Sequence, residues 1–237
     1  MTTRIASATA LVVTLLLTSG LAARKKEFTD SFMIESCNFA AEGTNPYLNL
    51  TPGYQLVLES APGKSKGGHV VLVSTVLDET EQVDGVTTRV VEERETEDGK
   101  LTEVSRNFFA LCKPTNSVFY FGEDVDDYDD TGTMVVDHDG AWRAGVAGAR
   151  PGIIMPGTVL LGARYFQEVA PDVALDRAEI VSLSEVVETP AGTFQGCLHT
   201  RETSALERGK SFKSYAPGIG LVRDDDLLLT RSGAVSR

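Results

Sequence analysis

The sequence is poor in the residues that build most metal and redox sites. It contains three cysteines, three histidines and one tryptophan among 237 residues. The wide spacing of Cys37, Cys112 and Cys197 matches no zinc-binding pattern. Two arrangements of these cysteines stay open, one disulfide with a free thiol or three buried thiols. The sequence also lacks the short motifs of serine hydrolases, zinc metalloproteases and cysteine proteases.

Basic residues are scarce relative to acidic ones. The chain has 22 Lys and Arg against 34 Asp and Glu, which gives a formal net charge of −12. A chain of this charge repels nucleic acids and anionic lipid surfaces, so we expect neither as a partner. Cations, basic proteins and neutral small or polymeric ligands remain as candidate partners. No cofactor is indicated with certainty, and calcium is the one candidate.

Long apolar runs are limited to the N-terminus. Arg4 is followed by a largely apolar run at residues 5–17 and by small residues up to Ala23, which is typical of a secretory signal peptide. The run is shorter than the roughly 20 residues of a membrane span. We therefore predict a signal peptide at residues 1–23 and an exported domain, periplasmic or extracellular, at residues 24–237. The alternative is an uncleaved membrane anchor, favoured by the basic residues 24–26.

The remaining sequence is typical of antiparallel β-structure. Residues 54–59 alternate between apolar and polar, residues 70–77 are apolar on both faces, and residues 86–97 lie between two Asp-Gly turns. Further strands are predicted at residues 101–112, 117–122, 133–137, 165–169, 178–187, 193–203, 211–215 and 221–230. We expect one all-β domain with little helix, in which a strongly curved antiparallel sheet forms an open barrel, a half-barrel or a sandwich.

An acidic run at residues 123–130 is the sharpest chemical signal. Six of its eight residues are carboxylates, which repel one another unless solvent, salt or a metal screens them. Calcium prefers six to eight oxygen ligands, so the run supplies candidate metal ligands. The run departs from an EF-hand loop, because Asp129 stands where glycine is required and Val135 where glutamate is required. A solvated acidic loop is the alternative. The candidate calcium ligands are Asp124, Asp126, Asp127, Asp129 and Asp130.

A glycine-rich segment at residues 140–157 contains the one tryptophan and lacks a strand pattern. Long irregular loops commonly cover a sheet or close a binding site. We expect the segment to be either the gate of a ligand pocket or an apolar plug at one end of a barrel. The candidate ligand-binding residues are Trp142, Arg143, Ile153 and Met155 in this segment, with Phe119, Phe121 and Tyr165 outside it.

Several phrases resemble a group of uncharacterised secreted bacterial proteins over most of the chain after the signal peptide. These phrases lie at residues 45–53, 123–130, 151–157, 189–194 and 215–222. The last two phrases are also similar to half-barrel envelope proteins that are distantly similar to periplasmic lipoprotein carriers. This resemblance implies a curved antiparallel sheet with an apolar concave face, and it carries no catalytic residues.

Three functional hypotheses follow. The first is an exported, non-enzymatic β-domain that binds an apolar or polymeric ligand in the cell envelope. The second is a calcium-stabilised envelope interaction domain. The third is a hydrolase whose site is assembled from residues that are distant in the sequence.

Overall fold

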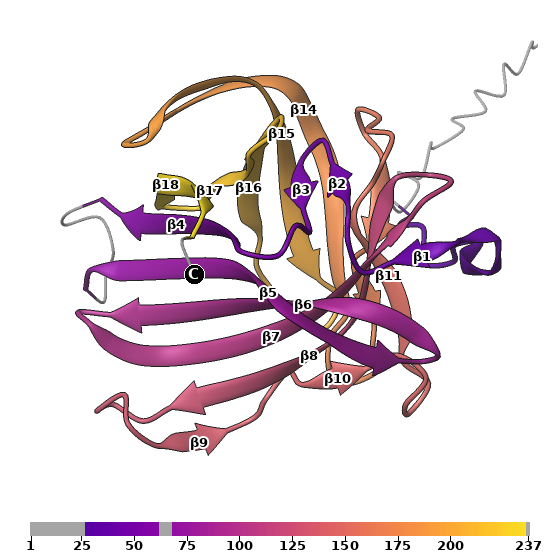
Figure 1. Ribbon diagram of the computed structural model, residues 1–237, viewed down its shortest axis with the longest axis horizontal. Coiled ribbons are helices and arrows are strands. Elements are labelled where there is room, and N and C mark those ends of the chain that lie inside the picture. Colours follow the sequence, from indigo (N-terminus) through magenta and orange to yellow (C-terminus); the bar gives the residue numbers. More distant parts are fainter. Residues whose placement is uncertain (1–26, 62–67, 236–237) are drawn as a thin grey trace, which may run out of the picture.

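The computed structural model describes residues 27–61 and 68–235 (Figure 1). The predicted signal peptide at residues 1–23 lies outside these ranges. Regular structure within them is β-strand apart from one turn of 3-10 helix, η1 (Ile34–Ser36). In the described part of the chain, no helix has the length and apolar character needed to cross a membrane. The predicted all-β class is confirmed.

The first half of the domain is an antiparallel meander of five strands. They are β4 (Tyr54–Ser60), β5 (Val70–Val83), β6 (Val86–Glu97), β7 (Lys100–Cys112) and β8 (Ser117–Tyr128). Two-residue turns at Asp84-Gly85 and Asp98-Gly99 connect β5 to β6 and β6 to β7, with φ of 48° and 50° at the aspartates. Positive φ at both turn positions gives a twist that matches the flanking strands, as the sequence predicted.

The C-terminal half forms a second antiparallel meander. Its strands are β14 (Asp176–Thr189), β15 (Gly192–Ser204), β16 (Ser211–Ala216), β17 (Gly220–Asp224) and β18 (Leu227–Ala234). β18 pairs antiparallel with β4, so the two meanders form one sheet (Figure 1). The single strand predicted at residues 221–230 was wrong, because a turn at Asp225 with φ of 47° divides it into β17 and β18.

The two edges of this sheet meet in one short stretch of chain. The strand order begins at β12 (Arg164–Phe166), which pairs with β14, and ends at β13 (Glu168–Val169), which pairs with β11 (Arg150–Met155). β11 in turn pairs with β8. Only Gln167 separates β12 from β13, so the sheet curls until it is a nearly closed barrel. This confirms the predicted strongly curved antiparallel sheet.

Short strands and one disulfide attach the remaining segments to the barrel. β1 (Phe39–Ala40) pairs with β7, whereas β9 (Val135–Asp137) and β10 (Trp142–Arg143) pair with β8. β2 (Thr44–Asn45) and β3 (Leu48–Asn49) form a separate hairpin. A disulfide joins Cys37 to Cys112 across 75 positions of the sequence, and Cys197 is a buried free thiol. The disulfide fixes the N-terminal segment to the end of β7.

Part of the apolar core lies between β8 and this N-terminal segment. The ring of Phe39 meets Phe119 and Phe121 edge-on, with centroid separations of 5.5 and 5.2 Å. Burial of each such ring contributes about 1.5–3 kcal/mol. A smaller cluster around Leu58, Val222 and Leu229 packs where β4, β17 and β18 lie side by side. The N-terminal segment thus covers one face of β8 and leaves the other face to the barrel interior.

Two local predictions were wrong. The strand predicted at residues 117–122 continues to Tyr128, so most of the acidic run belongs to β8 and is not a loop. The segment at residues 140–157, expected to be irregular, contains β10 and β11. Gly152 explains the second error, since a Cβ there would lie 2.5 Å from the carbonyl oxygens of Phe166 and Gln167. Close packing against residues 166–167 therefore requires glycine at this position. Because glycine has no side chain, the alternation of apolar and polar residues that indicates a strand is interrupted there.

Candidate functional site

A cavity of about 300 Å³ lies inside the barrel. Small-molecule sites commonly occupy about 300–1,000 Å³. In β6 and β7 the residues that line it stand at odd positions, because successive side chains of a strand point to opposite faces. These lining residues are Val91, Glu93, Glu103, Ser105, Asn107 and Phe109.

The wall of the cavity changes from apolar to acidic along β6. Val91 lies beside Val76 of β5 in the strand register. The next residue on the same face is Glu93, which lies opposite Ser74 of β5 and Ser105 of β7. The apolar part of the wall continues on other elements through Leu56, Ile154, Ile219 and Leu221. β6 therefore supplies both an apolar and an acidic part of the wall of the same cavity.

The acidic part of the wall has a large surplus of carboxyl groups. Among the lining residues Lys213 is the basic one, and it faces six acidic residues: Glu93, Glu103, Glu123, Glu168, Asp176 and Glu202. They come from both meanders and from β13, so they surround the cavity. This arrangement could not be predicted from the sequence, because glutamates on alternate positions of a strand are typical of a solvent-exposed face.

Lys213 is already neutralised by two carboxylates. Its Nζ lies 3.4 Å from Glu202 and 3.5 Å from Asp224. The Glu202 carboxylate, above all, holds the pKa of Lys213 well above its usual range. Glu202 also accepts hydrogen bonds of 3.3 Å from Gln167 and Thr200. The other carboxyl groups of the wall therefore share no more than a distant attraction to this ammonium.

Burial makes several of these carboxyl groups weak acids. It raises the pKa of Glu168 to about 8, with the nearby Asp176 adding to the effect. It raises the pKa of Glu123 to about 7, against a hydrogen bond from Tyr120. The pKa values of Glu93, Glu103 and Asp176 are raised for the same first reason. A buried carboxylate without a counter-charge is costly, so these groups retain protons that free carboxyls would lose.

Two buried polar groups beside the cavity have no hydrogen-bond partner within the described ranges. One is the hydroxyl of Tyr165, a residue only 5% exposed. Its neighbours Glu202 and Tyr215, whose charges interact with it, both line the cavity. The other is Nε1 of Trp142, whose ring meets that of Tyr120 at 5.3 Å. A buried group of this kind costs about 1–3 kcal/mol when unpaired, and neither of these two residues lines the cavity itself.

Part of the cavity is lined by the sequence neighbours of the predicted ligand-binding residues. Tyr120 and Ile154 are in its wall, whereas the residues on either side of them are not among its lining residues. Those flanking residues are the predicted Phe119, Phe121, Ile153 and Met155. The segment around residue 120 is apolar on both faces, since one face meets the cavity and the other meets the N-terminal segment. The alternation of apolar and polar residues therefore could not show which face of β8 lines the cavity.

The other three predicted ligand residues lie behind or outside the wall. Trp142 is 6% exposed and packs behind Tyr120. Arg143 stacks its guanidinium 4.1 Å from the ring centroid of Phe108 and pairs with Asp124 at 2.8 Å. Tyr165 lies in β12 beside the cavity, as described above. The structure thus brings these three near the barrel wall without placing them in the cavity lining.

The candidate calcium ligands lie in separate environments. Asp124 pairs with Arg143, and Asp126 lies 2.9 Å from Nδ1 of His138. Asp129 stabilises its own turn by accepting backbone hydrogen bonds of 2.9 Å from Thr133 and 3.2 Å from Met134, which lower its pKa.

The two remaining aspartates are no closer to a common centre. Asp127 is opposite Glu103 in the β7–β8 register, and Asp130 is exposed. In residues 27–61 and 68–235, no group of three His, Cys, Asp or Glu residues is arranged to hold a metal ion. The five aspartates therefore do not converge on a shared position in this structure.

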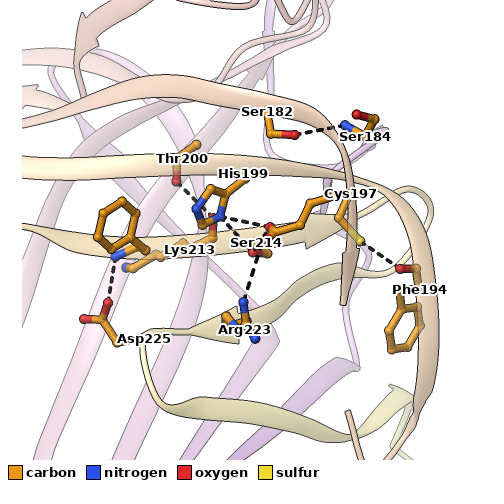
Figure 2. A network of polar contacts seen from close by, with 12 residues as sticks. Ser182, Ser184, Phe194, Cys197, His199, Thr200, Lys213, Ser214, Arg223 and Asp225 are labelled. Atoms are coloured by element: carbon orange, nitrogen blue, oxygen red, sulfur yellow. Dashed lines mark hydrogen bonds and ion pairs between the residues drawn. The ribbon is translucent and has the colours of Figure 1, made fainter. Parts of the chain in front are cut away.

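A polar network on β14, β15 and β16 brings together a serine, a histidine and a glutamate. Figure 2 labels the serine and the histidine, Ser214 and His199. Nδ1 of His199 lies 3.0 Å from Ser214 Oγ and 3.0 Å from Glu185 Oε2, and the serine donates to the same carboxylate at 2.7 Å. In a catalytic triad the serine and the acid contact opposite ring nitrogens. Here both contact one nitrogen, and Arg223 pairs with Glu185 at 3.6 Å. The network joins three strands and lacks triad geometry.

Comparison with known proteins adds little. No family model and no curated protein matches the sequence. A solved structure with partial similarity is that of a putative lipoprotein from Parabacteroides distasonis, with 16% sequence identity and a TM-score of 0.36. The match covers 81% of this chain and 100% of that one. Similarity at this level carries no argument about function, so the cavity itself must supply one.

Proposed function

We propose that this protein is exported and binds a small amphipathic molecule inside its barrel. One observation carries the proposal: a cavity of about 300 Å³ has an apolar wall next to a set of carboxyl groups, of which those of Glu168 and Glu202 are buried. Ligand sites typically combine such a mostly apolar surface with a few polar groups that fix orientation. The proposal narrows the hypothesis of an apolar or polymeric ligand to a molecule small enough to be enclosed.

Two features support the exported location. The signal-like segment at residues 1–23 precedes the domain, and Cys37 is bonded to Cys112. Structural disulfides persist in oxidising compartments and are rare in the cytosol. The alternative is retention at a membrane by an uncleaved N-terminal segment. The mass of the purified native protein distinguishes the two, because it shows whether residues 1–23 have been removed.

The frame around the cavity favours binding because it is already organised. Strands β5, β6, β7 and β8 pair over long stretches, and two of their connections are two-residue turns. A wall that is ordered before binding loses little conformational freedom when the ligand arrives. The ligand therefore has to supply only the contacts and its own loss of freedom.

The test uses the neutral apolar dye N-phenyl-1-naphthylamine and a variant that fills the cavity. Ser105 is 5% exposed and lines the cavity, so Ser105→Phe places a ring in the space. Trp142 is the one tryptophan and lies 5.3 Å from Tyr120 of the wall, so energy transfer from it to the dye reports binding there. We expect saturable transfer in the wild type, with at least tenfold weaker binding in the variant.

The matched control is Ser184→Phe, which adds the same ring at an exposed serine outside the cavity lining. It should bind the dye like the wild type. Circular dichroism establishes that both variants are folded before titration. Equal dye affinity in wild type and folded Ser105→Phe would show that the dye binds elsewhere, and would overturn the proposal. Absence of binding in the wild type would overturn it as well.

A further inference from the structure

We propose that the molecule bound in the barrel is an organic cation, with an amine or similar positive group among the carboxyl groups and an apolar body against the aliphatic and aromatic wall. The inference rests on the proposed function and adds the charge and polarity of the ligand. It is independent of the calcium hypothesis, because the residues concerned are different.

The first argument is the surplus of carboxyl groups over basic groups in the cavity lining. Lys213 is occupied by Glu202 and Asp224. Glu93, Glu103 and Glu123 face the same space from the neighbouring strands β6, β7 and β8. None of the three forms an ion pair with a basic side chain in the described ranges. A bound cation would supply the missing counter-charge in a partly buried site, where a charge pair is stronger than in water.

The second argument is the short distance between the two kinds of wall. Val91 and Glu93 are successive residues on one face of β6. Such residues are about 7 Å apart along a strand. A molecule with a ring and a two-carbon amine tail spans this distance, placing the ring beside Val91 and Phe109 and the ammonium beside Glu93. A hydrated inorganic cation would leave the apolar wall unused.

The third argument is the unpaired hydroxyl of Tyr165. This residue is 5% exposed, and its hydroxyl has no hydrogen-bond partner among the described residues. It lies near two residues of the wall: the charge of Glu202 acts on Tyr165, and Tyr165 acts on Tyr215. A phenol oxygen accepts a hydrogen bond from an ammonium or guanidinium group, which has only donors to offer. Tyr165 does not itself line the cavity, so its hydroxyl is an unpaired acceptor behind the part of the wall formed by Glu202 and Tyr215.

Binding of a cation should be coupled to release of protons. Glu123 is faced by several acidic groups, namely Glu93, Glu103 and Asp176, and by the hydroxyl of Tyr120. Glu168 is faced by Glu123, Asp176 and Glu202, and Lys213 is the basic group of the lining. A cation stabilises the charged carboxylates and lowers their raised pKa values. Its affinity must therefore increase with pH, by about tenfold between pH 6 and pH 8 for Glu123 alone.

The experiment compares three probes that share a ring and differ in charge: 2-phenylethylamine, 2-phenylethanol and 3-phenylpropionate. Each displaces N-phenyl-1-naphthylamine from the full chain at pH 8. We expect the amine to bind at least tenfold more tightly than the alcohol, and the carboxylate to bind least. The amine affinity should rise from pH 6 to pH 8, whereas the alcohol affinity should not.

Substitutions then locate the effect. Glu93→Gln and Glu123→Gln should each weaken amine binding at least fivefold and leave the affinity for the alcohol within twofold. The matched control is Glu92→Gln, one position away on β6 and paired with Arg94 outside the cavity lining. It should change neither affinity.

The outcomes separate this inference from the proposed function. Alcohol binding equal to or tighter than amine binding, or an amine affinity that falls as pH rises, would overturn the charge assignment and leave the cavity as a binding site. Loss of dye binding in the Ser105→Phe test is a separate requirement, and its failure would overturn both.

Discussion

Glu168 predicts a loss of stability at alkaline pH that one substitution should remove. Its side chain is 3% exposed, and burial raises its pKa from the ordinary 4.5 to about 8. A carboxyl group with a raised pKa in the folded state contributes stability that is complete below about pH 4.5 and is lost as pH rises through about 8. The linkage relation gives a loss of about 2–3 kcal/mol between pH 6 and pH 9.

The matching variant is Glu168→Gln, which is neutral at every pH. Its amide oxygen can still accept the hydrogen bond that the backbone N–H of Asp176 donates to Glu168. At about 2–4 °C per kcal/mol for a domain of this size, the wild type should lose about 5–10 °C more than the variant between pH 6 and pH 9. Thermal unfolding followed by circular dichroism measures both slopes. Glu92→Gln on the outside should behave like the wild type. Equal slopes for wild type and Glu168→Gln would refute the assigned burial of this carboxyl.

Three further predictions concern other parts of the fold. The Cys37–Cys112 disulfide closes a loop of 75 positions, so Cys37→Ser with Cys112→Ser should lower the free energy of unfolding in urea by about 4 kcal/mol; a change below 1 kcal/mol would contradict this. Arg164, with Arg201, holds the pKa of Glu179 at about 2, so its stabilisation is present above pH 4.5 and is lost as pH falls toward 2. Acid unfolding of Glu179→Gln should therefore show a weaker dependence on pH than the wild type below pH 4.5, and an unchanged profile would count against the pairing. The calcium hypothesis predicts that metal-stripped protein melts at least a few degrees higher in millimolar calcium than in chelator, and that Asp126→Asn with Asp127→Asn abolishes the shift; identical melting in both solutions would refute it.

Most of the fold could be predicted because its signals are local. Asp-Gly at residues 84–85 and 98–99 imposes a two-residue turn wherever the flanking segments alternate, and the structure has both turns. The closure of the sheet could not be predicted in this way. It depends on the pairing of β12 with β14 and of β13 with β11. These pairings join segments that are distant in the sequence, and the close approach of β11 to residues 166–167 requires Gly152.

The candidate site was harder to predict than the fold because its residues resemble an exposed surface. In β6, Glu92 and Arg94 lie outside the cavity lining while Glu93 lies within it, so both faces of the strand are charged. Period-2 alternation identifies a buried face only when that face is apolar. The aromatic residues of β8 could not be assigned to a face from the sequence for the opposite reason, since both faces of β8 near Tyr120 are apolar and buried. Only the strand register and the course of the N-terminal segment distinguish the two faces.

The two halves of the site depend on the same topological feature. Gln167, between β12 and β13, donates to Glu202 of β15 at 3.3 Å, and Glu202 in turn holds Lys213 of β16. The residue that closes the sheet therefore also fixes the one internal pair of opposite charge in the cavity lining. Glu168, the next residue, enters the wall from the other sheet edge as an acid with a raised pKa. Closure of the barrel thus creates the cavity and, in the same step, removes Glu168 and Glu202 from bulk water. The raised pKa values of the acidic lining residues, the proposed preference for a cation and the predicted sensitivity to alkaline pH all follow from this single arrangement, and a variant that opens the sheet between β12 and β13 should abolish all three together.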